Sequence, residues 1–361
     1  MRENKVVYGL IGYGGMGRWH TEILSNVSEA VIGGIYDIKK EKREEAKEKG
    51  FFVYETEEAM LADPDIDVVL IATPNDCHKP IAIRAMHAGK NVISEKPVTL
   101  SSADLLEMEH AAKETGKLLT VHQNRRWDDD FLIIKKLVEE QKLGHVFRIE
   151  SRVHGSRGIP GDWRKEKVHG GGMVLDWGVH LLDQILYMYG DRKIETVYAS
   201  LTNVTNQEVD DGFTAILTFE GGTEVLVEVG TNNYISLPRW YVLGEDGTAV
   251  IRDWQLNGEI IRKTGRTEET VVPVKTAAGL TKTMAPRRED TIVKEDLPKV
   301  SGDIADFHRN VVAVIRDGAD QAVPGDARDE TDGSNLPVSR DKPGDRISGS
   351  GVTKKILNNY R

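Results

Sequence analysis

The amino-acid sequence predicts an α/β fold, with an N-terminal doubly wound parallel sheet of the Rossmann type and a C-terminal α+β domain built on a large, mainly antiparallel open sheet. Up to about residue 126, short and almost continuously apolar stretches alternate with helix-compatible stretches, which is typical of parallel strands covered by helices on both faces. From residue 196 onward the apolar residues recur with a period of two, which is typical of antiparallel strands. We therefore expect two domains in the 361 residues.

The first predicted strand, residues 6–11, runs directly into the pattern Gly-x-Gly-x-x-Gly. In a dinucleotide-binding βαβ unit, Gly12 permits the tight turn, Gly14 lets the backbone approach a pyrophosphate, and Gly17 lets helix and strand pack closely. The helix that begins here also offers unpaired backbone N–H groups to the phosphates. We expect this loop to contact a dinucleotide through Gly12, Tyr13, Gly14, Gly15, Met16 and Gly17.

A second apolar strand, residues 30–36, ends in Asp37, twenty residues after Gly17. At that position a carboxylate accepts hydrogen bonds from the adenosine ribose. The alternative for Asp37 is an ordinary turn residue at a strand end. The carboxylate favours NAD because it would repel a 2′-phosphate, while the neighbouring Lys39 keeps NADP open.

The carboxyl ends of the parallel strands should meet at one edge of the sheet, where ligands of such folds bind. The remaining predicted elements of this domain are the helices 39–49, 79–88 and 102–115 and the strands 67–73, 91–94 and 118–121. For His78, a role at the start of the following helix is an alternative to cofactor binding. We expect cofactor contacts from Thr73, Pro74, Asn75, His78, Glu95, Lys96 and Gln123, and substrate contacts from Lys96, Asn124 and Arg125.

The C-terminal half mixes helices with strands of period two. Gly221 and Gly222 should form a hairpin turn between two of the strands. The helices are expected at 131–140, 174–189 and 306–316, and the strands at 146–153, 196–201, 213–219, 223–229, 240–243 and 248–251. The predicted domains are a cofactor-binding domain, a substrate and oligomerisation domain, and an irregular tail, at residues 1–126, 127–317 and 318–361.

Three glycines at 170–172 precede the pair Asp176 and His180, whose spacing of four places both side chains on one face of a helix. Histidine is the usual proton shuttle near neutral pH, and a carboxylate beside it can orient the imidazole or bind a substrate hydroxyl. A helix-stabilising contact is the plain alternative. We expect no metal here, because the chain lacks His-Glu-x-x-His and has a single cysteine. Asp183, one turn further on, is expected to tune the neighbouring groups or cap the helix rather than to act in catalysis.

Two further groups are candidates near the reacting atoms. Lys96 follows a strand end and can stabilise a developing alkoxide, although the local sequence alone favours an exposed lysine beside a turn proline. Trp163 and Arg164 precede the three glycines, where the indole can form a wall for a sugar or nicotinamide ring. Anchoring of the loop is an equally good interpretation of Trp163.

These motifs occur in the same order as in the Gfo/Idh/MocA oxidoreductases, and the chain resembles that family over roughly residues 5–315. The resemblance rests on the strand with GxGxxG, Asp37, residues 72–75 with His78, residues 95–97, and the segment 170–180. It implies a Rossmann domain and an open sheet whose face often builds dimers or tetramers. It also implies hydride transfer between NAD(P) and a hydroxyl or carbonyl carbon of a sugar, inositol or related polyol, with Lys96, Asp176 and His180 as catalytic residues.

Composition excludes several other classes of protein. A net charge of −10 argues against nucleic-acid and anionic membrane partners, and no apolar run approaches the length of a membrane span. One cysteine, Cys77, permits no intrachain disulfide, and the first strand begins almost at once, so a cytoplasmic protein is expected. We expect a homodimer or homotetramer formed through the C-terminal sheet, and no membrane or nucleic-acid partner.

Two other functions remain open at this stage: a non-catalytic dinucleotide or sugar sensor, and a glycosidase that uses NAD transiently. Lys282, Arg287 and Arg288 can favour an acidic substrate, but an exposed basic loop is the better interpretation. The tail after residue 317 is rich in Gly, Pro, Asp and Ser, where the family usually continues into another amphipathic helix. We hypothesise that this tail is not the ancestral ending, for example after a shift of reading frame.

Overall fold

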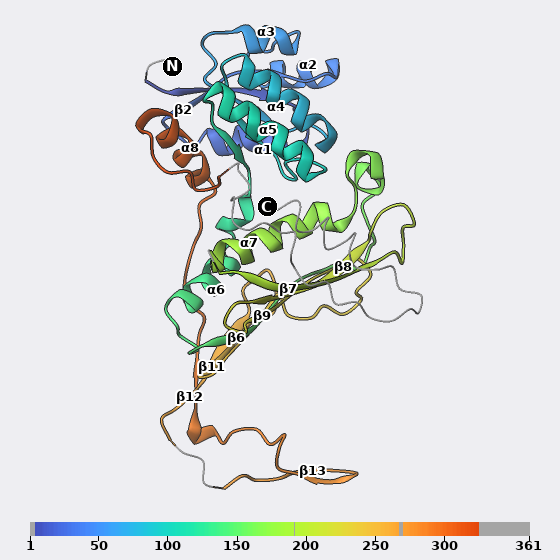
Figure 1. The fold of residues 1–361 in the computed structure, drawn as a ribbon, viewed down its shortest axis with the longest axis vertical. Coiled ribbons are helices and arrows are strands. Elements are labelled where there is room, and N and C mark those ends of the chain that lie inside the picture. The colour runs from blue at the N-terminus through green and yellow to red at the C-terminus, as the bar shows by residue number, and fades with distance from the viewer. Residues whose placement is uncertain (1–3, 191, 267–269, 325–361) are drawn as a thin grey trace.

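The structure is a computed structural model that describes residues 4–190, 192–266 and 270–324. It contains a five-stranded sheet in the order β2-β1-β3-β4-β5 and an eight-stranded sheet in the order β15-β12-β11-β10-β6-β9-β8-β7 (Figure 1). All neighbours in the first sheet are parallel, and all but one pair in the second are antiparallel. The predicted fold class is confirmed.

The N-terminal sheet is buried on both faces, which explains its almost continuously apolar strands. Every residue of β1 and β3 is buried, and helices cover the sheet (Figure 1). The strands are β1 Val6–Ile11, β2 Ala30–Tyr36, β3 Val68–Ile71, β4 Asn91–Ser94 and β5 Leu119–Val121. The helices are α1 Gly15–Leu24, α2 Lys40–Glu48, α3 Glu57–Ala62, α4 His78–His87 and α5 Ser102–Thr115. The short α3, which was not predicted from the sequence, is capped by Thr56, whose side chain accepts a hydrogen bond from the Ala59 N–H.

Within the described residues, the second sheet carries helices on one face only (Figure 1). The helices α6 Asp129–Glu139 and α7 Val179–Tyr189 lie between it and the Rossmann domain (Figure 1). Its core includes Phe131, Phe213 and Trp240, all fully buried. The hairpin at Gly221 and Gly222 is confirmed, because both residues have positive φ angles of 90° and 83°. The strands are β6 Val146–His154, β7 Ile194–Thr202, β8 Gly212–Phe219, β9 Glu224–Gly230, β10 Trp240–Gly244, β11 Gly247–Ile251, β12 Gly258–Lys263 and β15 Ile292–Glu295.

A long arm leaves the second sheet between β12 and β15, and the sequence analysis did not foresee it. Its two short strands, β13 Val274–Thr276 and β14 Gly279–Thr281, pair with each other at the far end of the molecule (Figure 1). Lys282, Arg287 and Arg288 are exposed on this arm, as the exposed-loop interpretation predicts. Among the described residues, no helix is both long and apolar enough to cross a membrane.

The last helix of the described residues, α8 Ala305–Asp317, packs in the core of the Rossmann domain, whereas the sequence predicted that it belongs to the second domain. Its apolar residues Phe307, Val311 and Val312 pack in one cluster with β1. The assignment by sequence order failed because the chain crosses back after β15. A helix with one apolar stripe shows that it is buried but does not show against which domain.

The first residues of the predicted tail continue this packing. Residues 319–324 form no helix or strand, but Val323 is buried, and its carbonyl oxygen accepts a hydrogen bond of 2.6 Å from Thr120 Oγ1. The Ala322 carbonyl oxygen accepts a second one, of 2.7 Å, from Arg126. The rest of the predicted irregular tail, residues 325–361, lies outside the described residues.

Replacing Phe307 by Ala should lower the free energy of unfolding of the Rossmann domain by about 3–5 kcal/mol, because it leaves a cavity between α8 and the sheet. Urea unfolding followed by circular dichroism measures this. The exposed Leu106→Ala is the control and should change it by no more than about 0.5 kcal/mol. Equal, small effects of both substitutions would contradict the placement of α8.

Candidate active site

The loop between β1 and α1 has the backbone that a dinucleotide needs. Gly12 has a φ of +97°, and a Cβ there would collide with the Ala72 carbonyl group. A Cβ on Gly17 would collide with the Gly12 carbonyl oxygen. Two of the three motif glycines are therefore fixed by the fold itself, through the tight turn and the close packing of helix on strand.

The third motif glycine is free of such constraint and faces open space. A Cβ on Gly14 or Gly15 would meet no atom within 4 Å. Gly14 is also the N-cap residue of α1, and no side chain caps the helix there, so its first N–H groups are available to an anion. The exposed Met16 lies in the same turn. The loop and the helix N-terminus therefore fit a diphosphate.

Asp37, at the end of β2, holds the glycine loop in place. One carboxylate oxygen accepts a hydrogen bond of 2.7 Å from the Tyr13 N–H, and the other accepts one of 2.8 Å from the Lys39 N–H. A carboxylate has about four acceptor positions, so ribose hydroxyls can still bind. The Tyr13 ring is buried against Phe51, which leaves only its backbone at the loop.

Three residues predicted to contact the cofactor are instead engaged with the protein. His78 is fully buried, and its two ring nitrogens lie 2.9 and 3.0 Å from the carbonyl oxygens of Pro97 and Thr73. Asn75 is buried and donates to the His169 carbonyl oxygen at 3.0 Å. His78 has no ring nitrogen left for a ligand, so we withdraw it as a cofactor contact.

Glu95 is the third of these residues. It is buried, and its Oε1 lies 2.8 Å from a ring nitrogen of His20 and 2.9 Å from one of His122. Its Oε2 accepts a hydrogen bond of 3.1 Å from the Lys96 N–H. Burial acts to raise the pKa of Glu95, but the neighbouring His122 and His20 outweigh it and hold the pKa well below its usual range. Glu95 therefore positions the backbone of Lys96 and does not face a ligand.

The structure brings Lys96 and Asp176 together across the two domains. The Lys96 ammonium donates to the Asp176 carbonyl oxygen at 3.0 Å and to its carboxylate at 3.1 Å. The other carboxylate oxygen accepts from Arg164 Nε at 3.0 Å. Burial acts to raise the pKa of Asp176, but Lys96 and Arg164 outweigh it, so the pKa is lowered and Asp176 is ionised.

His180 lies at the start of α7 and is almost completely buried. Its pKa is held well below the usual range, first by burial and then by the positive charges of Lys96 and Arg125, so the imidazole is neutral near pH 7. Among the described residues its Nδ1 has no hydrogen-bond partner. The predicted contact of Asp176 with this imidazole is not found, because the carboxylate pairs with the two cations instead.

The turn that presents Asp176 is π-helical and spans Val174–Gly178. Gly172, with a φ of +103°, lies so close to Asp210 that a side chain would not fit. Asp210 in turn accepts a hydrogen bond of 2.8 Å from the Val174 N–H. Single π-helical turns inside helices are frequent at functional sites.

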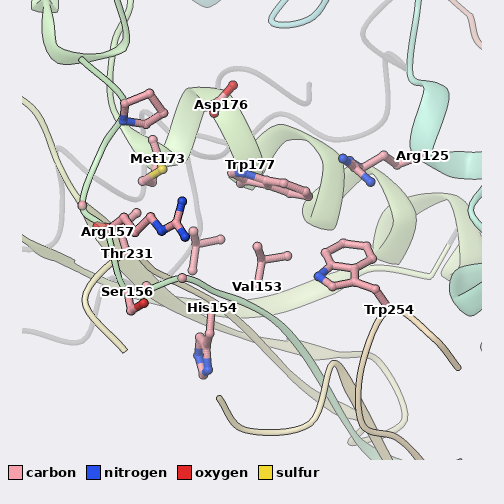
Figure 2. Close-up of a pocket in the computed structure, with 15 residues that line it drawn as sticks. Arg125, Val153, His154, Ser156, Arg157, Met173, Asp176, Trp177, Thr231 and Trp254 are labelled. Carbon is pink, nitrogen blue, oxygen red and sulfur yellow. The ribbon is translucent and has the colours of Figure 1, made fainter. Parts of the chain in front are cut away.

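A cavity of about 620 Å³ adjoins Asp176 at the carboxyl ends of β6 and β9. Arg125, Trp177 and Trp254 lie together at one end (Figure 2), with the guanidinium 4.1 Å from the Trp177 ring and 5.6 Å from the Trp254 ring. The lining residues are Arg125, Val153, His154, Gly155, Ser156, Arg157, Gly158, Pro160, Met173, Asp176, Trp177, Val229, Gly230, Thr231 and Trp254.

The tryptophans that line this cavity are Trp177 and Trp254 and not Trp163, for which a ring wall and a loop anchor were equally good interpretations. Trp163 is not among the lining residues, and its ring lies 4.6 Å from the guanidinium of Arg164. Trp177 stands inside the recognised motif, next to Asp176, and that position was a usable signal. Trp254 follows β11 in a turn, and nothing in its local sequence connects it to the motif.

Several buried polar atoms near the site have no partner in the part of the chain that the structure describes. They include Gln123 Oε1, Asn124 Oδ1, Arg125 Nε and His180 Nδ1. Such atoms are costly unless something binds them, so they point to a polar ligand. The segment Asn124–Trp127 that carries two of them is fixed by α7: Arg126 forms two hydrogen bonds with Asp183, of 2.7 and 2.6 Å. Asp183 thus anchors a loop.

This fold and this site define a dinucleotide-dependent oxidoreductase with a second, C-terminal domain. Residues 6–123 match the model of an oxidoreductase family with an NAD-binding Rossmann fold, and residues 131–250 match the GFO/IDH/MocA C-terminal domain. The chain belongs to the Gfo/Idh/MocA family of oxidoreductases, as the resemblance predicted, and NAD or NADP is its cofactor.

Among its relatives, the scyllo-inositol 2-dehydrogenase (NADP(+)) IolW of Bacillus subtilis is 28% identical over 86% of both chains. The myo-inositol 2-dehydrogenase of Thermotoga maritima is 30% identical over 59% of this chain and 65% of its own. The chain spans about half the length of several other relatives. A solved NAD-binding protein from Listeria innocua is 49% identical, with a TM-score of 0.85, over 89% of this chain and 92% of its own.

Replacing Gly14 by Ala should weaken NADH binding at least about tenfold without changing the melting temperature. The methyl group meets no protein atom, but it occupies the space through which a pyrophosphate approaches the backbone. Fluorescence titration and thermal unfolding measure the two quantities. Gly265→Ala, at another open position, is the control and should change neither. Unaltered NADH affinity in Gly14→Ala would show that the dinucleotide binds elsewhere.

Proposed function

We propose that this protein is an NAD(P)-dependent dehydrogenase that oxidises a hydroxyl carbon of a sugar, inositol or related polyol, or reduces the corresponding carbonyl. The observation that carries the proposal is the meeting of Lys96 and Asp176, from two domains, beside the buried neutral His180. The aromatic and polar cavity next to Asp176 suits a polyol, because indole faces pack against C–H groups while polar groups bind the hydroxyls. The names of two relatives point to inositols.

The proposed roles follow from the protonation states. Neutral His180 accepts the proton of the substrate hydroxyl as a general base. Lys96 has three N–H donors, of which Asp176 occupies two, so one remains for the same substrate oxygen and stabilises its developing negative charge. Asp176 orients that ammonium. When bound, the nicotinamide supplies the redox chemistry by exchanging a hydride with the carbinol carbon.

The residues proposed to hold the cofactor are those of the glycine loop, Asp37, and Gln123, whose amide oxygen has no partner in the described part of the chain. Asp37 favours NAD, since its carboxylate lies at the ribose end of β2 and would repel a 2′-phosphate. Lys39, exposed and close by in sequence, keeps NADP possible, and the relative IolW carries NADP in its name. A cytoplasmic location remains a prediction from the single cysteine.

NADH formation from NAD⁺ should occur with at least one member of a panel of inositols, aldoses and sugar acids, and Lys96→Ala should lower kcat about a hundredfold or more. The variant should still bind NADH, since Lys96 is proposed to act on the substrate oxygen. Lys79→Ala, whose lysine pairs with Asp104 on the surface, is the control and should keep full turnover. If no compound of the panel is oxidised although NADH binds, the result would favour a non-catalytic sensor. Cleavage of a glycosidic bond without net formation of NADH would favour the glycosidase.

The pH dependence of oxidation follows from the lowered pKa of His180. A base must be unprotonated, and a pKa depressed in the folded protein keeps the imidazole neutral to pH values well below the ordinary histidine range. The logarithm of kcat/KM should therefore stay level as the pH falls from 7 through 6.5. An acidic limb centred at or above 6.5 would contradict the role of His180 or its burial.

We also propose that the open face of the C-terminal sheet joins copies of the chain. Tyr198, Ile216 and Leu226 are register neighbours on β7, β8 and β9 and form an apolar row on that face. Tyr198 is 56% exposed. Ile216→Arg should convert a dimer or tetramer to a smaller species in light scattering after gel filtration, whereas Thr196→Arg at the sheet margin should have a weaker effect. A wild-type monomer at micromolar concentration would refute this assembly.

A further inference from the structure

Behind the proposed active site lies a cluster of three fully buried histidines that the reaction does not use. His20 comes from α1, His122 follows β5, and His308 comes from α8. One ring nitrogen can be chosen from each histidine so that the three nitrogens lie within 4.8 Å of one another. The three rings are also in mutual contact, with centroids 4.4–6.0 Å apart.

Glu95 sets the orientation of two of these rings. Its Oε1 accepts hydrogen bonds from His20 Nε2 at 2.8 Å and from His122 Nδ1 at 2.9 Å. Each of these imidazoles, when neutral, then carries its lone pair on the other nitrogen, which is His20 Nδ1 and His122 Nε2. A carboxylate that accepts the remaining N–H of a histidine is the usual support of a histidine that ligates a metal.

The distances within the cluster suit a tetrahedral ion. His20 Nδ1 and His308 Nε2 are 3.4 Å apart. Two nitrogens bound to zinc at about 2.0–2.1 Å with tetrahedral angles lie about 3.3–3.4 Å apart. Two ligand nitrogens at the outer limit of 4.8 Å would have to approach each other by about 1.4 Å to reach this separation, through rotation of their side chains.

The unpaired atoms point the same way. In the described part of the chain, His122 Nε2 and His308 Nδ1 have no hydrogen-bond partner. A buried imidazole nitrogen without a partner is costly, and a bound cation would relieve that cost for His122.

We propose that His20, His122 and His308 bind one divalent transition-metal ion, Zn²⁺ by their chemistry, with Glu95 orienting two of the ligands. Three neutral imidazoles and no thiolate suit Zn²⁺, which prefers four-coordinate tetrahedral sites. The site ties the returning helix α8 to α1 and to the end of β5. Its role is to fix the C-terminal segment to the Rossmann domain, beside the backbone of Lys96.

The test uses the full chain, stripped with a chelator and titrated with Co²⁺ and Zn²⁺. The wild type should take up one equivalent of Co²⁺ with the intense visible absorption of a tetrahedral complex, and Zn²⁺ should displace it and raise the melting temperature. His308→Gln should weaken the affinity for Co²⁺ more than about tenfold, and Glu95→Gln about 10- to 100-fold. His110→Gln, on the exposed face of α5, is the matched control and should bind as the wild type does.

Absence of stoichiometric uptake by the wild type, or equal uptake by His308→Gln, would overturn the proposal and leave a buried hydrogen-bonded cluster. NADH binding, which does not depend on the ion, verifies that each variant is folded. If His308→Gln does not fold, X-ray absorption of the zinc-loaded wild type decides. Three imidazole nitrogens at about 2.0 Å support the site, and an oxygen-only shell refutes it.

Discussion

The contact on which the site depends is the pairing of the Lys96 ammonium with Asp176. It joins the segment that follows β4 to the π-helical turn that precedes α7, through bonds to both the carbonyl and the carboxylate oxygen. Because both residues are largely buried, the pair holds only while each charge has its partner. Together with the hydrogen bond from Asn75 to the His169 carbonyl oxygen, this pair connects the Rossmann domain to the second domain beside the cavity.

Neighbouring groups hold the Lys96–Asp176 pair in place. Glu95 bonds to the Lys96 N–H on one side, and Arg164 bonds to the Asp176 carboxylate on the other. On the helix α7, Asp183 fixes Arg126, and Gln184 donates to the Arg125 carbonyl oxygen at 2.6 Å, which holds Arg125 over the tryptophans of the cavity. The functional side chains are thus held by buried charge-assisted hydrogen bonds, which restrict their motion more than exposed ion pairs do.

Much of this arrangement was predictable from the sequence, because it depends on local patterns. The apolar strands, the motif glycines and the hairpin at Gly221 and Gly222 each follow from backbone preferences that the local sequence shows. Contacts between distant segments were not predictable. His78 belongs to the recognised motif, yet its ring nitrogens contact two backbone carbonyl groups. Trp254 and His308 contact residues that are far from them in the sequence, Arg125 and His20, so these contacts form only in the folded chain. The return of α8 to the first domain was missed for the same reason.

The proposed roles of His180 and Lys96 imply direct transfer of a hydride from a polyol carbon to the cofactor. The most direct measurement incubates the protein with NAD⁺ and a polyol deuterated at its carbinol carbons, and follows the label by mass spectrometry. We expect one deuterium atom in the reduced nicotinamide and a slower rate than with the unlabelled polyol. Reduced cofactor without the label, or no reduction by any polyol that binds, would contradict these roles.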